Sequence, residues 1–316
     1  MTEAESSDAH WERDVLRKLA LETLAEQKRR RRWGIFFKLL GFAYLSFLIV
    51  MFGDFDWKSE TFEGRKHSAL VDVSGVIGAS GEASAERLMA SLQSAFEAKS
   101  TAGVILRINS PGGSPVQSGI INDEIRRLRK KYPAIPLYAV VEDICASGGY
   151  YVAVAADKIF VDKASIVGSI GVLMDGFGFT GAMDKLGVER RLLTAGENKG
   201  FLDPFSPQQE RHRQHAQVLL DDGHRQFVEV VRAGRGHRLK ETPDMFSGLM
   251  WTGARSIELG LTDGLGSVEG VARDIIKAED ILDYTQRQNL AERFAKRLGA
   301  GVAEELASRL SGFGWR

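Results

Sequence analysis

The chain has 316 residues, of which 44% are hydrophobic and 27% are charged. This composition is that of a folded protein and argues against disorder, and the length allows one large or two ordinary domains. Acidic and basic residues balance at 42 each, so no overall positive field indicates nucleic acid as a partner.

A basic run and an apolar stretch come first along the chain. Five cationic residues, Lys28 to Arg32, precede Trp33–Phe52, in which Lys38 is the only charged residue. At about 1.5 Å per residue, a helix of this length spans the roughly 30 Å of bilayer hydrocarbon. Its apolar residues occupy all faces, which favours a transmembrane helix over a buried soluble one. We predict an uncleaved signal anchor at residues 33–52, because no small-residue cleavage site follows it.

The charges that flank this stretch predict its orientation. Positive charge is concentrated before the stretch, which places the N-terminus in the cytoplasm and the chain beyond Phe52 across the membrane. Residues 1–32 are then a cytoplasmic segment, and residues 53–68 a polar connector.

The next part of the chain alternates strand and helix patterns. Apolar runs predict strands at Ala69–Gly78, Gly103–Ile108, Ile135–Val141 and Lys158–Asp162. Helical spacing predicts helices at Ser84–Lys99, Pro115–Lys131, Ser147–Ala156 and, further on, Pro207–Arg232. Such alternation predicts an α/β domain at residues 69–280 with a largely parallel sheet. Residues 187–194 are expected to be extended.

A C-terminal helical extension is predicted at residues 281–316. Apolar residues recur there every four positions from Leu290 to Leu310, with Gly299 and Gly301 as interruptions. This extension could dock on its own domain, on a neighbouring subunit or on the membrane surface.

The sequence INSPGGS, Ile108 to Ser114, follows the second predicted strand. Pro111 fixes one backbone torsion, while Gly112 and Gly113 can adopt angles that aim amide hydrogens into a cleft. Amides aimed in this way can stabilise an oxyanion. A plain strand-to-helix turn capped by a serine is the alternative.

Ser147 lies where the third predicted strand gives way to a helix. The free amides at a helix N-terminus favour developing negative charge, and ligands of open α/β sheets bind at such strand ends. Serine is also a common helix cap, so the position alone allows either a nucleophile or a cap. A nucleophilic serine needs a base to remove its proton.

Lysine is the better candidate for that base than histidine. None of the six histidines lies in a strand-to-helix turn, and His212 and His215 are interpreted as solvated residues rather than a metal pair. Lys199 lies between two glycines, with Phe201 nearby to exclude water. A lysine amine acts as a base near neutral pH only where apolar surroundings disfavour its ammonium form. An ordinary surface lysine is the alternative.

Taken together, these segments resemble the S49 family of serine proteases, the signal peptide peptidase A group, whose fold is similar to that of ClpP and the crotonases. The resemblance covers residues 70–275 and rests on INSPGGS, ASGGYYVAVAAD, VGSIGV, TAGENK and MWTGARSIELGLTDGLG. The segment around Lys199 lacks the tyrosine and aspartate of the commonest members.

The resemblance implies a role for each matched residue. Ser147 would be the nucleophile, Lys199 the general base, Ser169 the hydroxyl that orients the lysine amine, and the amides of Gly113 and Gly148 the oxyanion hole. It also implies a homo-oligomeric ring tethered to the membrane, with dyad residues from adjacent subunits, a protease domain on the periplasmic side, and signal peptides as substrates. No cofactor or metal is expected. A crotonase-type acyl-CoA enzyme and an inactive membrane scaffold are the alternatives.

Overall fold

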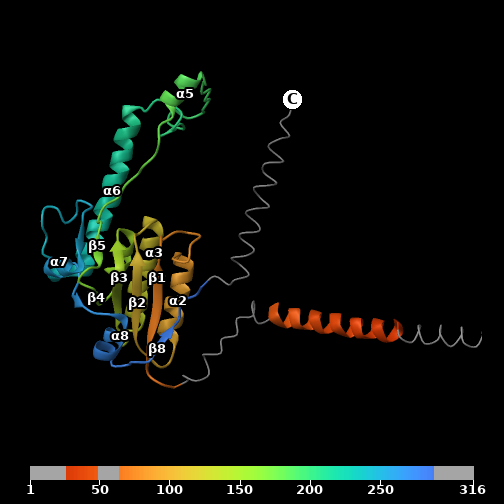
Figure 1. The fold of residues 1–316 in the computed structure, drawn as a ribbon. Helices are drawn as coiled ribbons and strands as arrows, with labels where there is room; N and C mark the ends of the chain where they lie inside the picture. The colour runs from red at the N-terminus through yellow and green to blue at the C-terminus, as the bar shows by residue number, and fades with distance from the viewer. Residues whose placement is uncertain (1–25, 49–63, 288–316) are drawn as a thin grey trace, which may run out of the picture. The chain divides into compact units, whose positions relative to one another are not determined.

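A computed structural model of the chain describes residues 26–48 and 64–287 (Figure 1). The chain divides into two units, and residues 62–287 form the compact one. The predicted connector, from 53, lies mostly outside the described residues, as does the C-terminal extension beyond 287.

Residues 26–48 form a helix, which covers most of the predicted anchor. Its apolar side chains are exposed, with Phe37 60% and Leu40 54% accessible. Among the described residues, no helix has both the length and the apolar content needed to cross a membrane. Residues 49–52 lie outside the described part, so the transmembrane anchor stays a prediction.

The compact unit is built on a mainly parallel sheet. Its strands are β1 (His67–Ser74), β2 (Thr101–Ser110), β3 (Leu137–Ala146), β4 (Lys158–Val161), β5 (Ile166–Gly168), β6 (Met250–Thr252), β7 (Gly264–Leu265) and β8 (Ile281–Asp283). The order is β6-β5-β3-β2-β1-β8, with β4 between β3 and β7, and only the β5–β6 pair is antiparallel. The predicted mixed α/β fold with a parallel sheet is confirmed.

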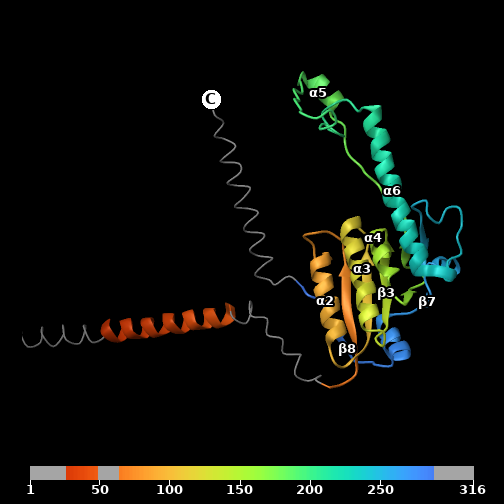
Figure 2. The ribbon, with the colours of Figure 1, turned by 180° about the vertical axis from the view of Figure 1, so that it is seen from behind.

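Helices lie on both faces of this sheet. They are α2 (Ala85–Glu97), α3 (Pro115–Lys131), α4 (Gly148–Ala153), α5 (Thr180–Leu186), α6 (Glu210–Arg235), α7 (Gly253–Glu258), α8 (Val268–Gly270) and the short helices η1 (Gly236–Arg238) and η2 (Val271–Ile276). Figure 2 shows α2, α3 and α4 on one face. Strand residues alternate between the two faces: Ala69 and Val71 join the large core under α2 and α3, while Leu70 packs with η2.

Strand β3 changes its partner halfway along. Its first half, Tyr138–Val141, pairs with β4, and its last residues, Ile144–Ala146, pair with β5. The β2–β3 ladder shifts register in the same region. Such irregularities bend a strand and re-aim the residue that follows, and here the following residue is Ser147.

Two expectations differ from the structure. Residues 187–194 form no strand, because they are exposed and have no neighbouring strand to complete a ladder. The sequence predicts a helical extension from residue 281, but Ile281 to Asp283 form strand β8 and pair with Ser68 to Leu70, so the sheet continues past 280.

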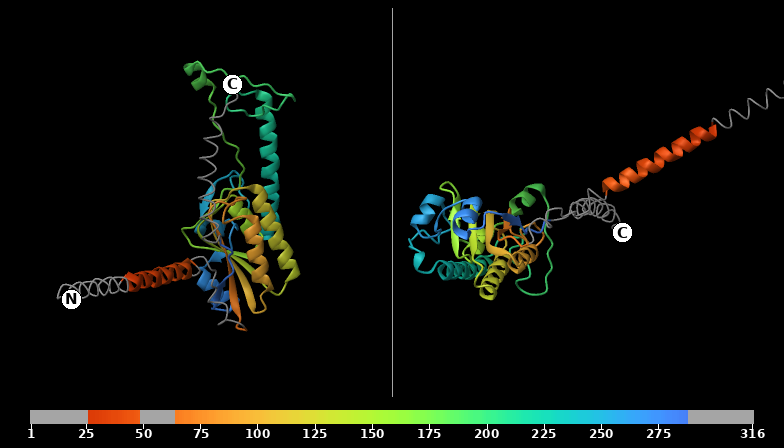
Figure 3. Two further views of the ribbon diagram at one scale, coloured as in Figure 1. Left: turned by 90° about the vertical axis from the view of Figure 1, so that its right-hand side faces the viewer. Right: turned by 90° about the horizontal axis from the view of Figure 1, so that it is seen from below.

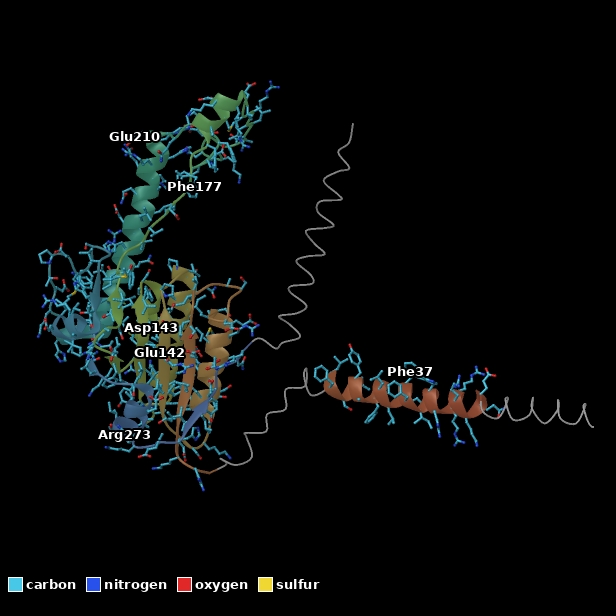
Figure 4. The ribbon with its side chains drawn as sticks, in the orientation of Figure 1. Phe37, Glu142, Asp143, Phe177, Glu210 and Arg273 are labelled. Carbon is cyan, nitrogen blue, oxygen red and sulfur yellow. The ribbon has the colours of Figure 1, made fainter. Side chains whose placement is uncertain are left out.

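Residues 170–209 and the first half of α6 form a projection that we call the arm. Figure 3 shows α6 extending away from the sheet, with α5 and its flanking loops at the far end. The lower half of α6 packs on α4, where the rings of Tyr151 and Phe227 lie 5.1 Å apart. Figure 4 shows Phe177 and Glu210 on the arm, far from Glu142 and Asp143 at the sheet.

Candidate active site

Ser147 sits at the sharp turn from β3 into α4 in a strained conformation. Its backbone angles are φ 51 and ψ −122, in a region that residues with a side chain rarely adopt. Such strain costs roughly 1–3 kcal/mol and gathers at functional sites. The serine occupies the N-cap position, yet its side chain makes no capping hydrogen bond. The alternative that Ser147 is a helix cap is therefore not what the structure shows.

The glycine turn lies directly against this serine. Gly112 and Gly113 have φ of 102 and 149, in the left-handed half of the map that favours glycine. A Cβ at Gly112 would lie 2.7 Å from Cβ of Ser147, and one at Gly113 would overlap the carbonyl of Ile77. Neither glycine could therefore be replaced without moving its neighbour.

The backbones of Gly113 and Gly148 lie close together. Gly113 pairs with Ile77 in a parallel bridge, in which the carbonyl of Gly112 accepts from the amide of Ile77 and the amide of Ser114 donates to the carbonyl of Ile77. The N–H of Gly113 takes no part in this bridge and points away from Ile77. On that side a Cβ at Gly148 would lie 3.2 Å from the Gly113 nitrogen. Gly148 is the first residue of α4, where amides have no partner within the helix. The two amide nitrogens therefore lie close together beside Ser147.

Ser169 lies beside Ser147 at the carboxyl ends of the neighbouring strands β5 and β3. Ala146 and Gly168 are paired in the β3–β5 ladder, and each serine follows its paired residue directly. The amide of Ser147 donates to the carbonyl of Gly168 at 2.8 Å. Ser169 also has a positive φ, of 52, and its amide donates to the carbonyl of Leu249 at 2.7 Å.

Buried groups hold the segment around Ser147 in place. The Tyr150 hydroxyl donates to the carbonyl of Leu261 at 2.7 Å, and burial raises its pKa. Cys145 is fully buried, which raises the pKa of its thiol and leaves it unreactive. The hydroxyl of Ser110 donates to the carbonyl of Gly75 and accepts from the amide of Gly112, so it shapes the glycine turn.

Lys199 does not join Ser147 within one chain. It lies in an exposed turn of the arm, where the next segment packs on α6 through Phe201 and His212, whose rings are 5.3 Å apart. The helix from His212 down to Phe227, beside α4, is about 22 Å long. The apolar shelter expected around Lys199 is therefore absent in the single chain as described.

The interpretation of His212 as a solvated residue is wrong. Its side chain is 6% exposed because the arm folds over it, and among the described residues its Nε2 has no hydrogen-bond partner. It lines a cavity of about 810 Å³ in the arm, which Ser147 does not reach. In residues 26–48 and 64–287, no His, Cys, Asp or Glu cluster is placed to hold a metal ion.

Comparison with known proteins assigns the chain to a family. Residues 129–281 match peptidase family S49. A putative protease of Synechocystis is 34% identical over 205 residues, which cover 65% of this chain and 72% of that protein. The chain belongs to peptidase family S49. Another S49-like relative, a putative signal peptide peptidase SppA of Enterococcus faecium, is 29% identical over 81% of this chain and 78% of its own length.

A more similar relative is matched over a smaller share of its length. A protein named Na(+)/H(+) antiporter NhaA of Brucella abortus is 45% identical over 182 residues, 58% of this chain and 25% of that protein. The chain therefore spans about a quarter of that relative, whose name describes the whole of a much longer protein.

Sequence reasoning did not single out Ser118, which the structure places beside Gly148. Ser118, on α3, is fully buried and touches the backbone of Gly148. Its place four residues after the helix cap Ser114 was the available signal, because that spacing puts it on the helix face above the glycine turn.

Proposed function

We propose that the chain is a membrane-anchored serine endopeptidase that hydrolyses apolar peptides, such as signal peptides left in the membrane, with a Ser-Lys dyad. The observation that carries this proposal is the strained, uncapped Ser147 beside the neighbouring amides of Gly113 and Gly148. A nucleophile next to prepared oxyanion donors is the arrangement that acyl transfer requires.

The chemistry assigns one task to each residue. Ser147 Oγ attacks the scissile carbonyl, and its proton passes to the amine of Lys199. The amides of Gly113 and Gly148 stabilise the oxyanion, the lysine protonates the leaving amine, and water then hydrolyses the acyl-enzyme. Ser169, which follows the partner of Ala146 in the β3–β5 ladder, would orient the lysine amine.

A second copy of the chain supplies the lysine in this proposal. Lys199 lies on the arm, away from Ser147 of its own chain. The arm exposes large apolar side chains: Leu173 is 79% accessible, Phe177 81% and Leu193 96%. Exposed apolar surface of this kind is typical of an interaction site, and a ring of subunits would cover it while enclosing Lys199.

The membrane location and the substrate rest on two further observations. Helix 26–48 carries exposed apolar side chains directly after the basic run at residues 28–32, which supports a single anchor with a cytoplasmic N-terminus and a periplasmic peptidase domain. The Enterococcus relative is named as a putative signal peptide peptidase. An enzyme anchored beside the bilayer would meet apolar peptides released there.

A serine-directed fluorophosphonate probe tests the dyad. We expect the full chain in detergent to be labelled at Ser147, and we expect labelling and peptide hydrolysis to be lost in Ser147→Ala and to fall at least a hundredfold in Lys199→Ala. Lys185→Ala, which changes another lysine of the arm, is the control and should keep wild-type activity.

Two results would contradict the proposal. Wild-type hydrolysis by both dyad variants would show that neither residue carries the reaction. Absence of any labelling or hydrolysis in the wild-type protein would favour an inactive scaffold.

A further inference from the structure

The two amides of the proposed oxyanion hole belong to different segments. Gly113 lies in the turn after β2, whereas Gly148 begins α4 after β3. No covalent link therefore fixes the distance between them, and their spacing depends on the side chains that touch both. A misplacement of about 1 Å in an active site can cost about a hundredfold in rate.

Ser118 lies beside Gly148. A Cβ at Gly148 would lie 2.5 Å from Ser118 Oγ and 3.2 Å from the Gly113 nitrogen, so the hydroxyl and the amide flank the same point. Ser118 has no exposed surface. One turn further along α3, a second side chain contacts α4, because Asn122 Nδ2 donates to the carbonyl of Tyr151 at 2.6 Å.

The hydroxyl of Ser118 has no hydrogen-bond partner in the part of the chain that the structure describes. A serine within a helix commonly bonds the carbonyl four residues before it. Within residues 26–48 and 64–287, the hydrogen bond to that carbonyl of Ser114 comes from the backbone amide of Ser118. A buried hydroxyl without a partner lowers stability relative to alanine, so a benefit other than folding is needed to account for it.

We propose that Ser118 is a positioning residue of the oxyanion hole, whose buried hydroxyl fills the space beside Gly148 and holds that peptide at a fixed distance from the Gly113 amide. This inference rests on the proposed function, because it takes these two amides as the oxyanion donors. Ser118 touches neither substrate nor Ser147 Oγ in this role, and it acts through Gly148.

Ser118→Ala tests the role by separating rate from stability. We expect kcat for peptide hydrolysis and the rate of fluorophosphonate labelling to fall about tenfold or more, with KM within about twofold of wild type. The melting temperature should stay the same or rise, because an unpartnered buried hydroxyl is removed.

Ser91→Ala is the matched control. Ser91 is also a helix serine with almost no exposed surface, but its hydroxyl donates to the carbonyl of Arg87 and accepts from the amide of Gln286. Its loss should lower the melting temperature and leave kcat unchanged. A wild-type kcat in Ser118→Ala would overturn the proposal. A lower melting temperature would also overturn it if the fraction of unfolded protein accounts for the whole loss of rate.

A double-mutant cycle with Gly148→Ala asks whether Ser118 acts through Gly148. The added methyl group would collide with Ser118 Oγ, so Ser118→Ala should restore part of the activity that Gly148→Ala loses. Two effects that simply multiply would overturn the coupling. If the Ser147→Ala protein still hydrolyses peptides, the proposed function is overturned as well. If Ser147→Ala is inactive and Ser118→Ala has wild-type rates, only the role of Ser118 is overturned.

Discussion

At the scale of single residues, the local sequence identifies some residues of the proposed mechanism and does not identify the surroundings of others. Ser147 could be found from sequence, because a lone serine between a strand and a glycine pair marks a sharp turn, and the structure shows that turn. The position of Lys199 could not, because its surroundings depend on where the arm projects and on what covers it. The burial of His212 was missed for the same reason, since contact with Phe201 is made through the fold of the arm.

Arg235 and Asp263 form an ion pair that is largely shielded from solvent. Arg235 is 1% exposed and binds both carboxylate oxygens of Asp263, at 2.8 and 3.0 Å. Burial alone would raise the pKa of Asp263, but the hydrogen bonds and charge of Arg235 and the amide of Ile159 outweigh it and hold the pKa below its usual value. We expect Asp263→Asn to lower the free energy of unfolding by about 3 kcal/mol at pH 7, because Arg235 stays buried without its partner.

The pH dependence of this pair follows from the lowered pKa. The carboxylate stabilises the fold above the unfolded pKa of about 4, and that contribution is lost as the pH falls through the lower folded value. Urea unfolding of wild type and Asp263→Asn should therefore differ most at neutral pH and converge in acid. Asp274→Asn, at an exposed pair with Arg273, should change stability little at any pH. A difference that grows in acid would contradict the assignment.

At the scale of elements, the sequence predicts the helices and strands whose own residues carry the signal, such as a cap or a regular spacing of apolar side chains. Helix α3 was predicted with its observed bounds, Pro115–Lys131, because Ser114 caps it and proline occupies its first turn. Strand β8 has only three residues, and its identity as a strand comes from pairing with β1. Its pattern alone could not reveal that partner.

The packing of α6 on α4 gives a prediction at this scale. A Cβ at Gly234 would overlap the carbonyl oxygen of Val154, so Gly234→Ala should cost roughly 1–3 kcal/mol of stability and loosen the base of the arm. Gly223→Ala on the same helix is the control, because its nearest contact is the Val172 side chain at 3.7 Å. Alanine should leave stability there unchanged or raise it by up to about 1 kcal/mol. Equal unfolding midpoints in urea would show that α6 does not pack closely at Gly234.

At the scale of the whole molecule, one proposed active site needs two chains. Mixing and reassembling Ser147→Ala and Lys199→Ala subunits in equal amounts should recover about a quarter of the wild-type activity, because random assembly joins an intact serine to an intact lysine in that share of sites. Each variant alone should stay inactive. No recovery in the mixture, with intact oligomers by light scattering, would place both dyad residues in the same chain.

The arm joins the rest of the domain at two places near Ser147. The chain leaves the sheet directly after β5, at Ser169, and returns through α6, whose lower half rests on α4. The backbone at both ends of the arm is therefore continuous with segments that contact the Ser147 turn, through Ser169 after β5 and through α6 on α4. Contacts that a neighbouring subunit made with the arm would in this way bear on the position of Ser147.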